Sequence, residues 1–307
     1  MFRFLQRGAL RLMRLARDLA RGDWTERVAL LTLLVLLLHS FEEWYMRGPF
    51  QLLVVAGLAW RKWLGTPSFW YLAAALFGIT IYLNWANSDN HKYLMAYWCI
   101  ALCSAFSLAP EHRAEALAWN GRLLIGLCMG LAVFWRLSSD SYLNGTFFHF
   151  TLLADERFEY FGRWFGDASA ASLAYNRELR ELLVGGYLRD INLESVRLVD
   201  DTDLRFWAQF ITWWTVILEG SIAALFLWPD RDRTSIPRNS LLILFGLTTY
   251  SFAPVRGFGW MLMVLGFAQC KDDEGHFRLA YVFAMLAIQT YTLPYGAVWE
   301  GLVGLFA

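Results

Sequence analysis

The sequence predicts an all-α protein that crosses a membrane about nine times, within a range of about eight to ten spans. Hydrophobic residues make up 57% of its 307 residues, aromatic residues make up 17%, and 16 residues are tryptophan. The mean hydropathy of +0.37 is higher than ordinary soluble proteins reach. Long apolar runs separated by polar stretches are the third observation, since a helix of about 20 apolar residues crosses the hydrocarbon of a bilayer.

Nine apolar runs give this count. We place spans at residues 28–46, 50–60, 68–86, 92–109, 117–136, 206–228, 239–253, 257–270 and 277–293. The second, seventh and eighth are short, which indicates tilted, re-entrant or half-spans. The apolar tail 293–307 either completes the last span or lies in the interface.

Residues 1–26 are predicted to form a basic amphipathic helix that lies in the cytoplasmic interface. Six arginines fall on one side of such a helix, opposite leucine and alanine: Arg3, Arg7, Arg11, Arg14, Arg17 and Arg21. A face of this kind binds anionic lipid. A solvated helix of a soluble domain is the alternative, and nucleic acid is not an expected partner.

The distribution of charge predicts the orientation. With the N-terminus in the cytoplasm, the inward connections carry the basic residues of 61–62, 112–113 and 231–238, whereas acidic residues outnumber basic ones in 137–205. We therefore expect an integral protein of a bacterial cytoplasmic membrane. Residues 27–307 would form the transmembrane bundle, and 137–205 would be an extracytoplasmic loop or lid.

The segment 137–205 is the largest block predicted outside the membrane. Its stretches 145–150 and 158–165 are aromatic and charged, which is typical of elements that lie in the interface. Residues 173–189 have the pattern of a short amphipathic helix that ends at the glycine pair 185–186. We expect this segment to be too small for an independent domain with its own core.

Arg136 is the residue that most constrains the function. It closes the apolar run 123–135 and is followed by the polar turn 137–145. A guanidinium group keeps its proton at physiological pH, so Arg136 does not act as a base. It either anchors the helix end by reaching the interface or organises a site for an anion. Its neighbour Trp135 is a candidate substrate-binding residue.

His91 stands at the outer mouth of the fourth span, on the same side and at the same depth as Arg136. A histidine there either exchanges a proton near neutral pH or caps the helix and bonds a neighbour. Its neighbours Asn90 and Tyr93 are candidate substrate-binding residues.

A second polar cluster lies at the outer end of the first span. His39 shares a helix face with Glu42 and Glu43, and with His91 these groups offer the chemistry of metal ligands. The alternative is a helix end at the headgroups, with one of the carboxylates paired to Arg47. We expect no metal site, and His39 and Glu43 are the candidate ligands if one exists.

Glu219 is the third polar feature, deep within the apolar stretch 213–220. A carboxyl group there must be neutral or paired, and it faces other helices rather than lipid. It serves either as a structural hydrogen-bonding group or as part of a proton path. Arg122 and Arg256 are candidate partners.

Three stretches together resemble a known membrane family. Residues 90–94 (Asn-His-Lys-Tyr-Leu) resemble an Asn-His-x-Tyr-Leu signature at the head of a span. Residues 132–137 with 142–145, and 215–229 with Glu219, resemble the stretches that follow it. Over roughly residues 25–290 the pattern resembles the horizontally transferred transmembrane (HTTM) domain, the membrane part of vitamin K-dependent gamma-glutamyl carboxylases.

The resemblance implies roles for two residues. His91 falls on the functional histidine of the carboxylases, and Arg136 falls where they have the lysine proposed to deprotonate vitamin K hydroquinone. An arginine does not lose its proton as a buried lysine can, so glutamate carboxylation by that mechanism is not expected. A quinone-like ligand is the cofactor that the resemblance suggests.

We therefore predict an outward-facing polar pocket between the first, fourth, fifth and sixth spans. Arg136 would bind an anion or a quinone-like oxygen, His91 would exchange protons, and Glu219 would support the site. The substrate would be a lipid-soluble molecule or an exported peptide. The alternative is a non-catalytic membrane scaffold, or an accessory protein for an exported peptide, in which Arg136 and His91 anchor helix ends.

Overall fold

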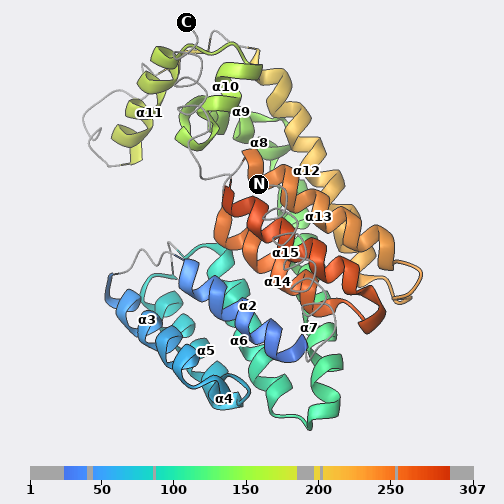
Figure 1. Cartoon of the computed structure of the whole chain (residues 1–307). Helices are drawn as coiled ribbons and strands as arrows, with labels where there is room; N and C mark the ends of the chain where they lie inside the picture. The colour runs from blue at the N-terminus through green and yellow to red at the C-terminus, as the bar shows by residue number, and fades with distance from the viewer. Residues whose placement is uncertain are drawn as a thin grey trace, which may run out of the picture. The chain divides into compact units, whose positions relative to one another are not determined.

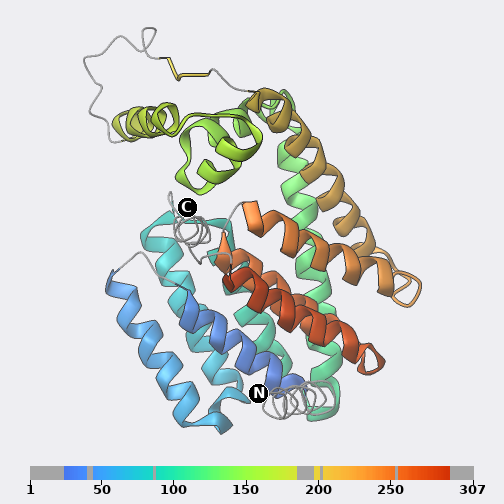
Figure 2. The same ribbon diagram turned by 45° about the horizontal axis from the view of Figure 1, so that its top comes forward.

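All regular secondary structure in the described part of the chain is helical (Figures 1 and 2). The computed structural model describes residues 24–39, 44–85, 88–184, 197–200, 203–252 and 255–290, and these ranges contain no strand. The predicted all-α class is confirmed for them. The basic helix predicted for residues 1–26 falls almost entirely outside the described residues, as does the tail 293–307.

Each predicted span coincides with a helix. In chain order these are α2 (Trp24–Leu38), α3 (Trp44–Ala59), α5 (Pro67–Leu83), α6 (Asn90–Phe106), α7 (Pro110–Leu137), α12 (Leu204–Leu227), α13 (Ser235–Phe252), α14 (Arg256–Gln269) and α15 (Gly275–Thr290). The first predicted span, 28–46, is wrong in its bounds. The helix α2 ends at Leu38, before the polar stretch 39–43, and α3 is correspondingly longer than predicted.

Two of the described helices are long and apolar enough to cross a membrane. The helix α7 has 28 residues and contains an 18-residue stretch with a mean hydropathy of 1.6, and α12 has 24 residues and contains such a stretch with a mean hydropathy of 1.7. The shorter helix α5 is also apolar along its 17 residues. Length and composition are thus consistent with a membrane location.

The described residues group into two compact units. Unit 1 takes its residues from Met1–Cys128, Ile222–Leu247 and Val255–Thr290, and unit 2 takes its residues from Met129–Ser221 and Thr248–Pro254. The division therefore falls within the sequences of α7 and α12 and not at the ends of the predicted lid, 137–205.

In unit 1, α2, α3, α5 and α6 lie side by side in both views (Figures 1 and 2). The Trp98 indole of α6 donates a hydrogen bond of 2.9 Å to the Thr32 hydroxyl of α2 within the buried core. The short helix α4 (Arg61–Leu64) packs against α5. Its Leu64 carbonyl oxygen accepts a hydrogen bond from the Trp70 indole of α5.

The helix α14 is the most deeply buried helix of unit 1. Every residue from Gly259 to Gln269 is buried, because α14 packs against α2, α6 and α15. The closest approach is at Gly266, where a Cβ atom would lie 2.4 Å from the ring of the fully buried Tyr281. The absence of a side chain at Gly266 is what allows α15 to pack this closely.

We expect Gly266→Ala to lower the free energy of unfolding by about 2 kcal/mol, because the Tyr281 ring has no room to move away. Gly78 in α5 is the matched control, since a Cβ atom there would meet nothing within 4 Å. There the same change should stabilise the helix by about 0.5 kcal/mol. Unfolding of the full-length variants in detergent measures both values. Equal effects at the two glycines would contradict the packing described here.

Unit 2 contains four short helices, which are α8 (Asp140–Leu143), α9 (Thr146–Ala154), α10 (Glu159–Phe165) and α11 (Ala170–Val184). They follow α7 in the chain and precede the first turns of α12. Gly145, with φ of 79°, lies against Gln209 of α12, whose side-chain amide donates a hydrogen bond of 3.0 Å to the Leu143 carbonyl oxygen. The predicted helix at 173–189 corresponds to α11, which ends just before the glycine pair.

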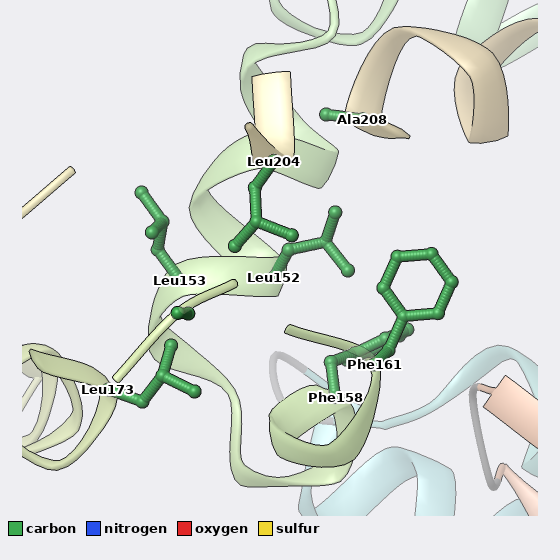
Figure 3. Close-up of a cluster of buried hydrophobic side chains, with 8 residues drawn as sticks. Leu152, Leu153, Phe158, Phe161, Leu173, Leu204 and Ala208 are labelled. Carbon is green, nitrogen blue, oxygen red and sulfur yellow. The ribbon is translucent and has the colours of Figure 1, made fainter. Parts of the chain in front are cut away.

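The segment 137–205, predicted to be too small for an independent domain with its own core, shares a buried core with the next long helix. A buried cluster is formed by Leu152, Leu153, Phe158, Phe161, Ala168, Leu173, Leu204 and Ala208 (Figure 3). Leu204 and Ala208 belong to α12, so the segment completes its core with the next long helix. Trp207 of α12 closes one side and donates a hydrogen bond of 2.7 Å to the Phe165 carbonyl oxygen.

A buried carboxylate supports this cluster. Asp155 caps the 3-10 turn η2 (Glu156–Phe158), accepts hydrogen bonds from the backbone and side chain of Arg157, and lies 3.8 Å from the Arg180 guanidinium group. Burial favours the neutral acid, but the hydrogen bonds from Arg157 and the charges of Arg157 and Arg180 outweigh it and lower the pKa of Asp155.

The lowered pKa of Asp155 predicts a pH dependence. Its stabilising contribution is complete above the unfolded-state pKa of about 3.9 and is lost as the pH falls through the lower folded-state pKa. We expect Asp155→Asn to cost about 1 kcal/mol at pH 7 and to flatten the loss of stability below about pH 4. Thermal unfolding of wild type and variant from pH 7 to pH 3 tests this. A constant difference between them at every pH would contradict it.

Candidate functional site

A cavity in unit 1 lies where α2 meets α3. The apolar end of α2, at residues 36–38, forms one wall, and Phe50 and Val54 of α3 form the other. Three polar side chains, those of His39, Arg47 and Gln51, also line the cavity, which has a volume of about 410 Å³. An apolar cavity with a few convergent polar groups is the usual form of a small-molecule site.

His91 lies beside His39, next to this cavity wall. The two ring centroids are 5.0 Å apart at an interplanar angle of 77°, so the edge of one ring faces the other. Asp89, which precedes α6, has a carboxylate oxygen 3.9 Å from the Nε2 atom of His91. The structure thus brings together two histidines that the sequence placed at the ends of separate helices.

The His39 and His91 rings lie close to α14 because residue 257 of that helix is a glycine. A Cβ atom at Gly257 would lie 3.1 Å from the Nδ1 atom of His39 and 3.6 Å from a carbon of the His91 ring. Any larger residue would displace His39. Gly257 is therefore a positioning residue that sequence reasoning missed, because it has no side chain to attract attention.

The neighbours of His91 have different surroundings. Asn90 is exposed at the first residue of α6, and Tyr93 is half-buried. Lys92, which stands between the motif residues, is only 1% exposed. A buried ammonium group is unusual in proteins, so Lys92 belongs among the residues of interest that the sequence interpretation passed over.

Of the residues predicted as possible metal ligands, only some lie in the part of the chain that the structure describes. Glu42 and Glu43 lie outside the described residues, so His39 is placed but its predicted carboxylate neighbours are not. Among the described residues no group of three or more histidine, cysteine, aspartate or glutamate side chains has an arrangement suited to a metal ion.

In unit 2, Arg136 forms an ion pair with Glu219. The Glu219 side chain is 5% exposed and that of Arg136 is 26% exposed, so the carboxylate is the buried member. Both residues were predicted from the sequence as candidate site residues, but with Arg122 and Arg256 as the candidate partners of Glu219. In the structure Arg122 instead donates a hydrogen bond of 2.6 Å to the Phe226 carbonyl oxygen.

Tyr142 covers the pair from α8. The Arg136 guanidinium carbon lies 5.2 Å from the centre of the Tyr142 ring, a favourable cation–π distance. The Thr215 hydroxyl donates to the Ile211 carbonyl oxygen, so the Tyr142 hydroxyl is the donor in their 2.9 Å hydrogen bond. Burial raises the pKa of Tyr142, although Arg136 and Thr215 oppose the rise. Tyr142 therefore keeps its proton near neutral pH.

Trp135 does not face this pair, because its side chain is 69% exposed on α7. Among the described residues its ring contact is with its neighbour Phe134. His91 belongs to unit 1, whereas Arg136 and Glu219 belong to unit 2. The single pocket predicted to unite them stays a prediction, and we describe two candidate sites.

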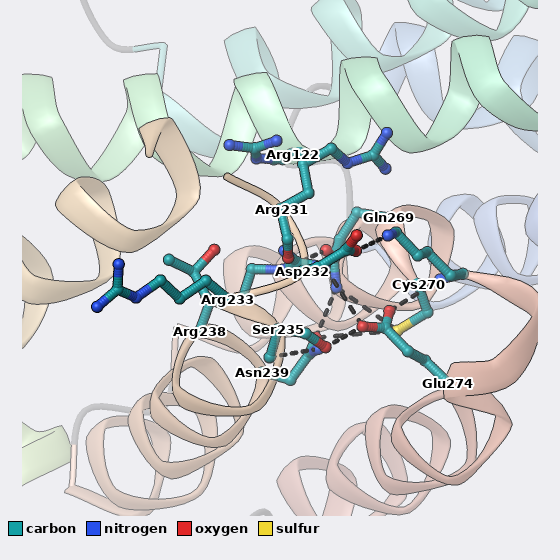
Figure 4. Close-up of polar contacts among 12 residues, drawn as sticks. Arg122, Arg231, Asp232, Arg233, Ser235, Arg238, Asn239, Gln269, Cys270 and Glu274 are labelled. Carbon is teal, nitrogen blue, oxygen red and sulfur yellow. Dashed lines mark hydrogen bonds and ion pairs between the residues drawn. The ribbon is translucent and has the colours of Figure 1, made fainter. Parts of the chain in front are cut away.

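A buried polar network in unit 1 was not predicted at all (Figure 4). The Asn239 amide oxygen accepts hydrogen bonds from the Gln269 amide at 2.6 Å and from the Tyr281 hydroxyl at 2.7 Å. Arg238 donates to the Gln269 amide oxygen at 2.9 Å and lies 3.6 Å from Glu274. These side chains lie at the predicted ends of spans, where polar residues appeared to mark boundaries.

No known protein family matches the chain, and no curated protein or solved structure is significantly similar to it. The function must therefore be inferred from the two sites themselves.

Proposed function

We propose that the chain is an integral membrane protein of the HTTM class, located in a bacterial cytoplasmic membrane with its N-terminus in the cytoplasm. The apolar segments that form helices, and the length of α7 and α12, support a membrane location. The order and spacing of the three family-like stretches support the class. About nine spans remain the number we propose.

We further propose that the cavity beside His39 binds a lipid-soluble, quinone-like molecule. The cavity is the observation that carries this proposal. Its walls are mainly leucine, valine and phenylalanine, which suit an apolar ring or isoprenoid chain. Arg47 and Gln51 supply hydrogen-bond donors for an oxygen atom, and a volume of about 410 Å³ accommodates a bicyclic ring.

The histidine pair supplies the chemistry that this site offers. A neutral histidine accepts a proton and its cation returns one, and both forms are accessible near neutral pH. His39 lines the cavity, and the His91 ring lies against the His39 ring. If His39 takes a proton from a bound hydroxyl group, His91 is the neighbouring group that can accept it next. Arg136 is no substitute for a lysine base, and glutamate carboxylation is not part of the proposal.

Filling the cavity without touching the histidines tests the proposal. Leu38→Trp places a large ring against the cavity, whereas Leu34→Trp makes the same change one turn earlier on α2, at an equally exposed position outside the lining. We expect the affinity of the full-length protein for a radiolabelled naphthoquinone with a short isoprenoid chain to fall by about tenfold or more in Leu38→Trp only. Equal affinity in both variants would overturn the proposal.

A second function is favoured by the Arg136–Glu219 pair. Because each charge has its partner within the protein, the pair needs no ligand, as expected of a membrane scaffold or an accessory protein for an exported peptide. Arg136→Lys separates the two functions. A scaffold would lose stability with no ligand effect, whereas a ligand site at Arg136 would lose ligand while the expression level stays near normal.

A further inference from the structure

Three arginines gather at one end of unit 1 and come from different parts of the chain. Arg122 belongs to α7, Arg231 to the connection between α12 and α13, and Arg238 to the first turns of α13 (Figure 4). They are close enough that the charges of Arg231 and Arg238 act on Arg122 and on each other. Arg122 and Arg238 are buried, and Arg231 is half-buried.

The negative charge around them does not balance this positive charge. Glu274 lies 3.6 Å from Arg238, and in the described ranges no carboxylate lies within ion-pair distance of Arg122 or Arg231. Of the other carboxylates nearby, the exposed Asp230 accepts hydrogen bonds from the backbone of Asp232 and Arg233. Asp232 pairs with Lys271, and Asp272 pairs with Arg278.

Two of the arginine nitrogens are buried and make no hydrogen bond. These are the Nε atom of Arg231 and the Nη2 atom of Arg238, and the latter lies 3.6 Å from a Glu274 carboxylate oxygen. The remaining donors of Arg238 reach the Gln269 amide oxygen and the Arg231 carbonyl oxygen. Buried donors are normally satisfied, and the single carboxylate of Glu274 cannot neutralise three guanidinium charges. Both observations indicate a missing anion.

We propose that Arg122, Arg231 and Arg238 form a binding site for a phosphate group. Guanidinium groups bind phosphate oxygens through paired N–H donors. A phosphate bound by all three arginines would offset the repulsion between their positive charges. The group is either the headgroup phosphate of an anionic phospholipid or a free phosphate ion. Basic sites between helices on the cytoplasmic side commonly bind lipid headgroups, and the charge pattern places this connection there. The proposal does not involve the cavity beside His39.

The test compares Arg231→Gln with Arg233→Gln in the full-length protein, purified in an uncharged detergent. Arg233 is the matched control because it is exposed in the same connection. Phosphatidylglycerol should raise the thermal midpoint of wild type and Arg233→Gln more than phosphatidylcholine does, and this gain should disappear in Arg231→Gln. Binding of phosphatidylglycerol, counted by native mass spectrometry, should weaken about tenfold in that variant.

A second measurement separates a ligand site from a structural role. Without lipid, Arg231→Gln should be at least as stable as wild type, because it removes one of three repelling charges, and Arg231→Lys should keep part of the lipid gain. Stabilisation by inorganic phosphate that is likewise lost in Arg231→Gln would support the site and identify a free ion as sufficient. Failure of Arg231→Gln to fold, or equal gains in wild type and variant with both anions, would overturn the proposal.

Discussion

Arg136→Met should lower the free energy of unfolding by about 3 kcal/mol, one of the two largest losses expected from a single change in the described part of this chain. The change leaves the Glu219 carboxylate buried without its partner, so the group must either stay charged in an apolar place or take up a proton. Loss of the cation–π contact with Tyr142 adds to the effect. Unfolding of the full-length protein in detergent measures the change.

Two further variants show that the loss comes from the pair. Arg205→Met removes an exposed arginine from the start of α12 and should change stability by less than about 0.5 kcal/mol. The exchange Arg136→Glu with Glu219→Arg restores opposite charges and should recover part of the loss. If Arg136→Met is as stable as wild type, the ion pair does not hold α7 to α12.

Asn239→Leu should cost about 3 kcal/mol for a different reason. Its amide oxygen accepts hydrogen bonds from Gln269 and Tyr281, and both of those side chains are fully buried. Leucine accepts no hydrogen bond, so two buried donors lose their partner at once, at about 1–3 kcal/mol each. The free energy of unfolding in detergent gives the value directly.

The neighbouring residue supplies the control for this network. Ser240→Leu makes a similar change at an exposed position of α13 and should be nearly neutral. The double variant Asn239→Leu with Tyr281→Phe should be more stable than the sum of its single changes predicts, because the second change removes one orphaned donor. Strict additivity would show that the two residues are not coupled.

The helices could be predicted from the sequence because the apolar runs are long and their ends are polar. The bounds of α6, α7 and α12 fall within a few residues of the prediction except at the start of α7, where polar residues precede the apolar run. The prediction that 28–46 is one span was wrong because span length was given more weight than the polar stretch 39–43. α2 ends at that stretch.

The core of unit 2 could not be predicted in the same way. Several of its apolar residues lie on η2, α9 and α10, which have three to nine residues, and no periodic pattern extends far enough there to recognise. Of its members on α12, Leu204 was assigned to the end of the predicted lid 137–205 and Ala208 to the start of a membrane span. The cluster exists only once α12 is placed beside the short helices.

The site residues were chosen from the cost of burying charge, and that reasoning identified Arg136, Glu219 and His91. It placed His91 near His39, and these two rings do lie together, but it could not say that Arg136 meets Glu219, because these residues are far apart in the chain and are brought together by tertiary structure. Gly257 has no functional group that would mark it as a site residue. The polar residues around Asn239 were interpreted as the ends of helices. Those features follow from packing rather than from residue type.

The most direct test of the central claim is native mass spectrometry of the full-length protein released gently from its own membrane. We expect the protein to remain in the membrane fraction through an alkaline wash. We further expect that a quinone-sized, lipid-soluble molecule accompanies wild type and Leu34→Trp but is absent from Leu38→Trp. Recovery of the protein in the soluble fraction, or wild-type protein that carries no such molecule, would contradict the claim.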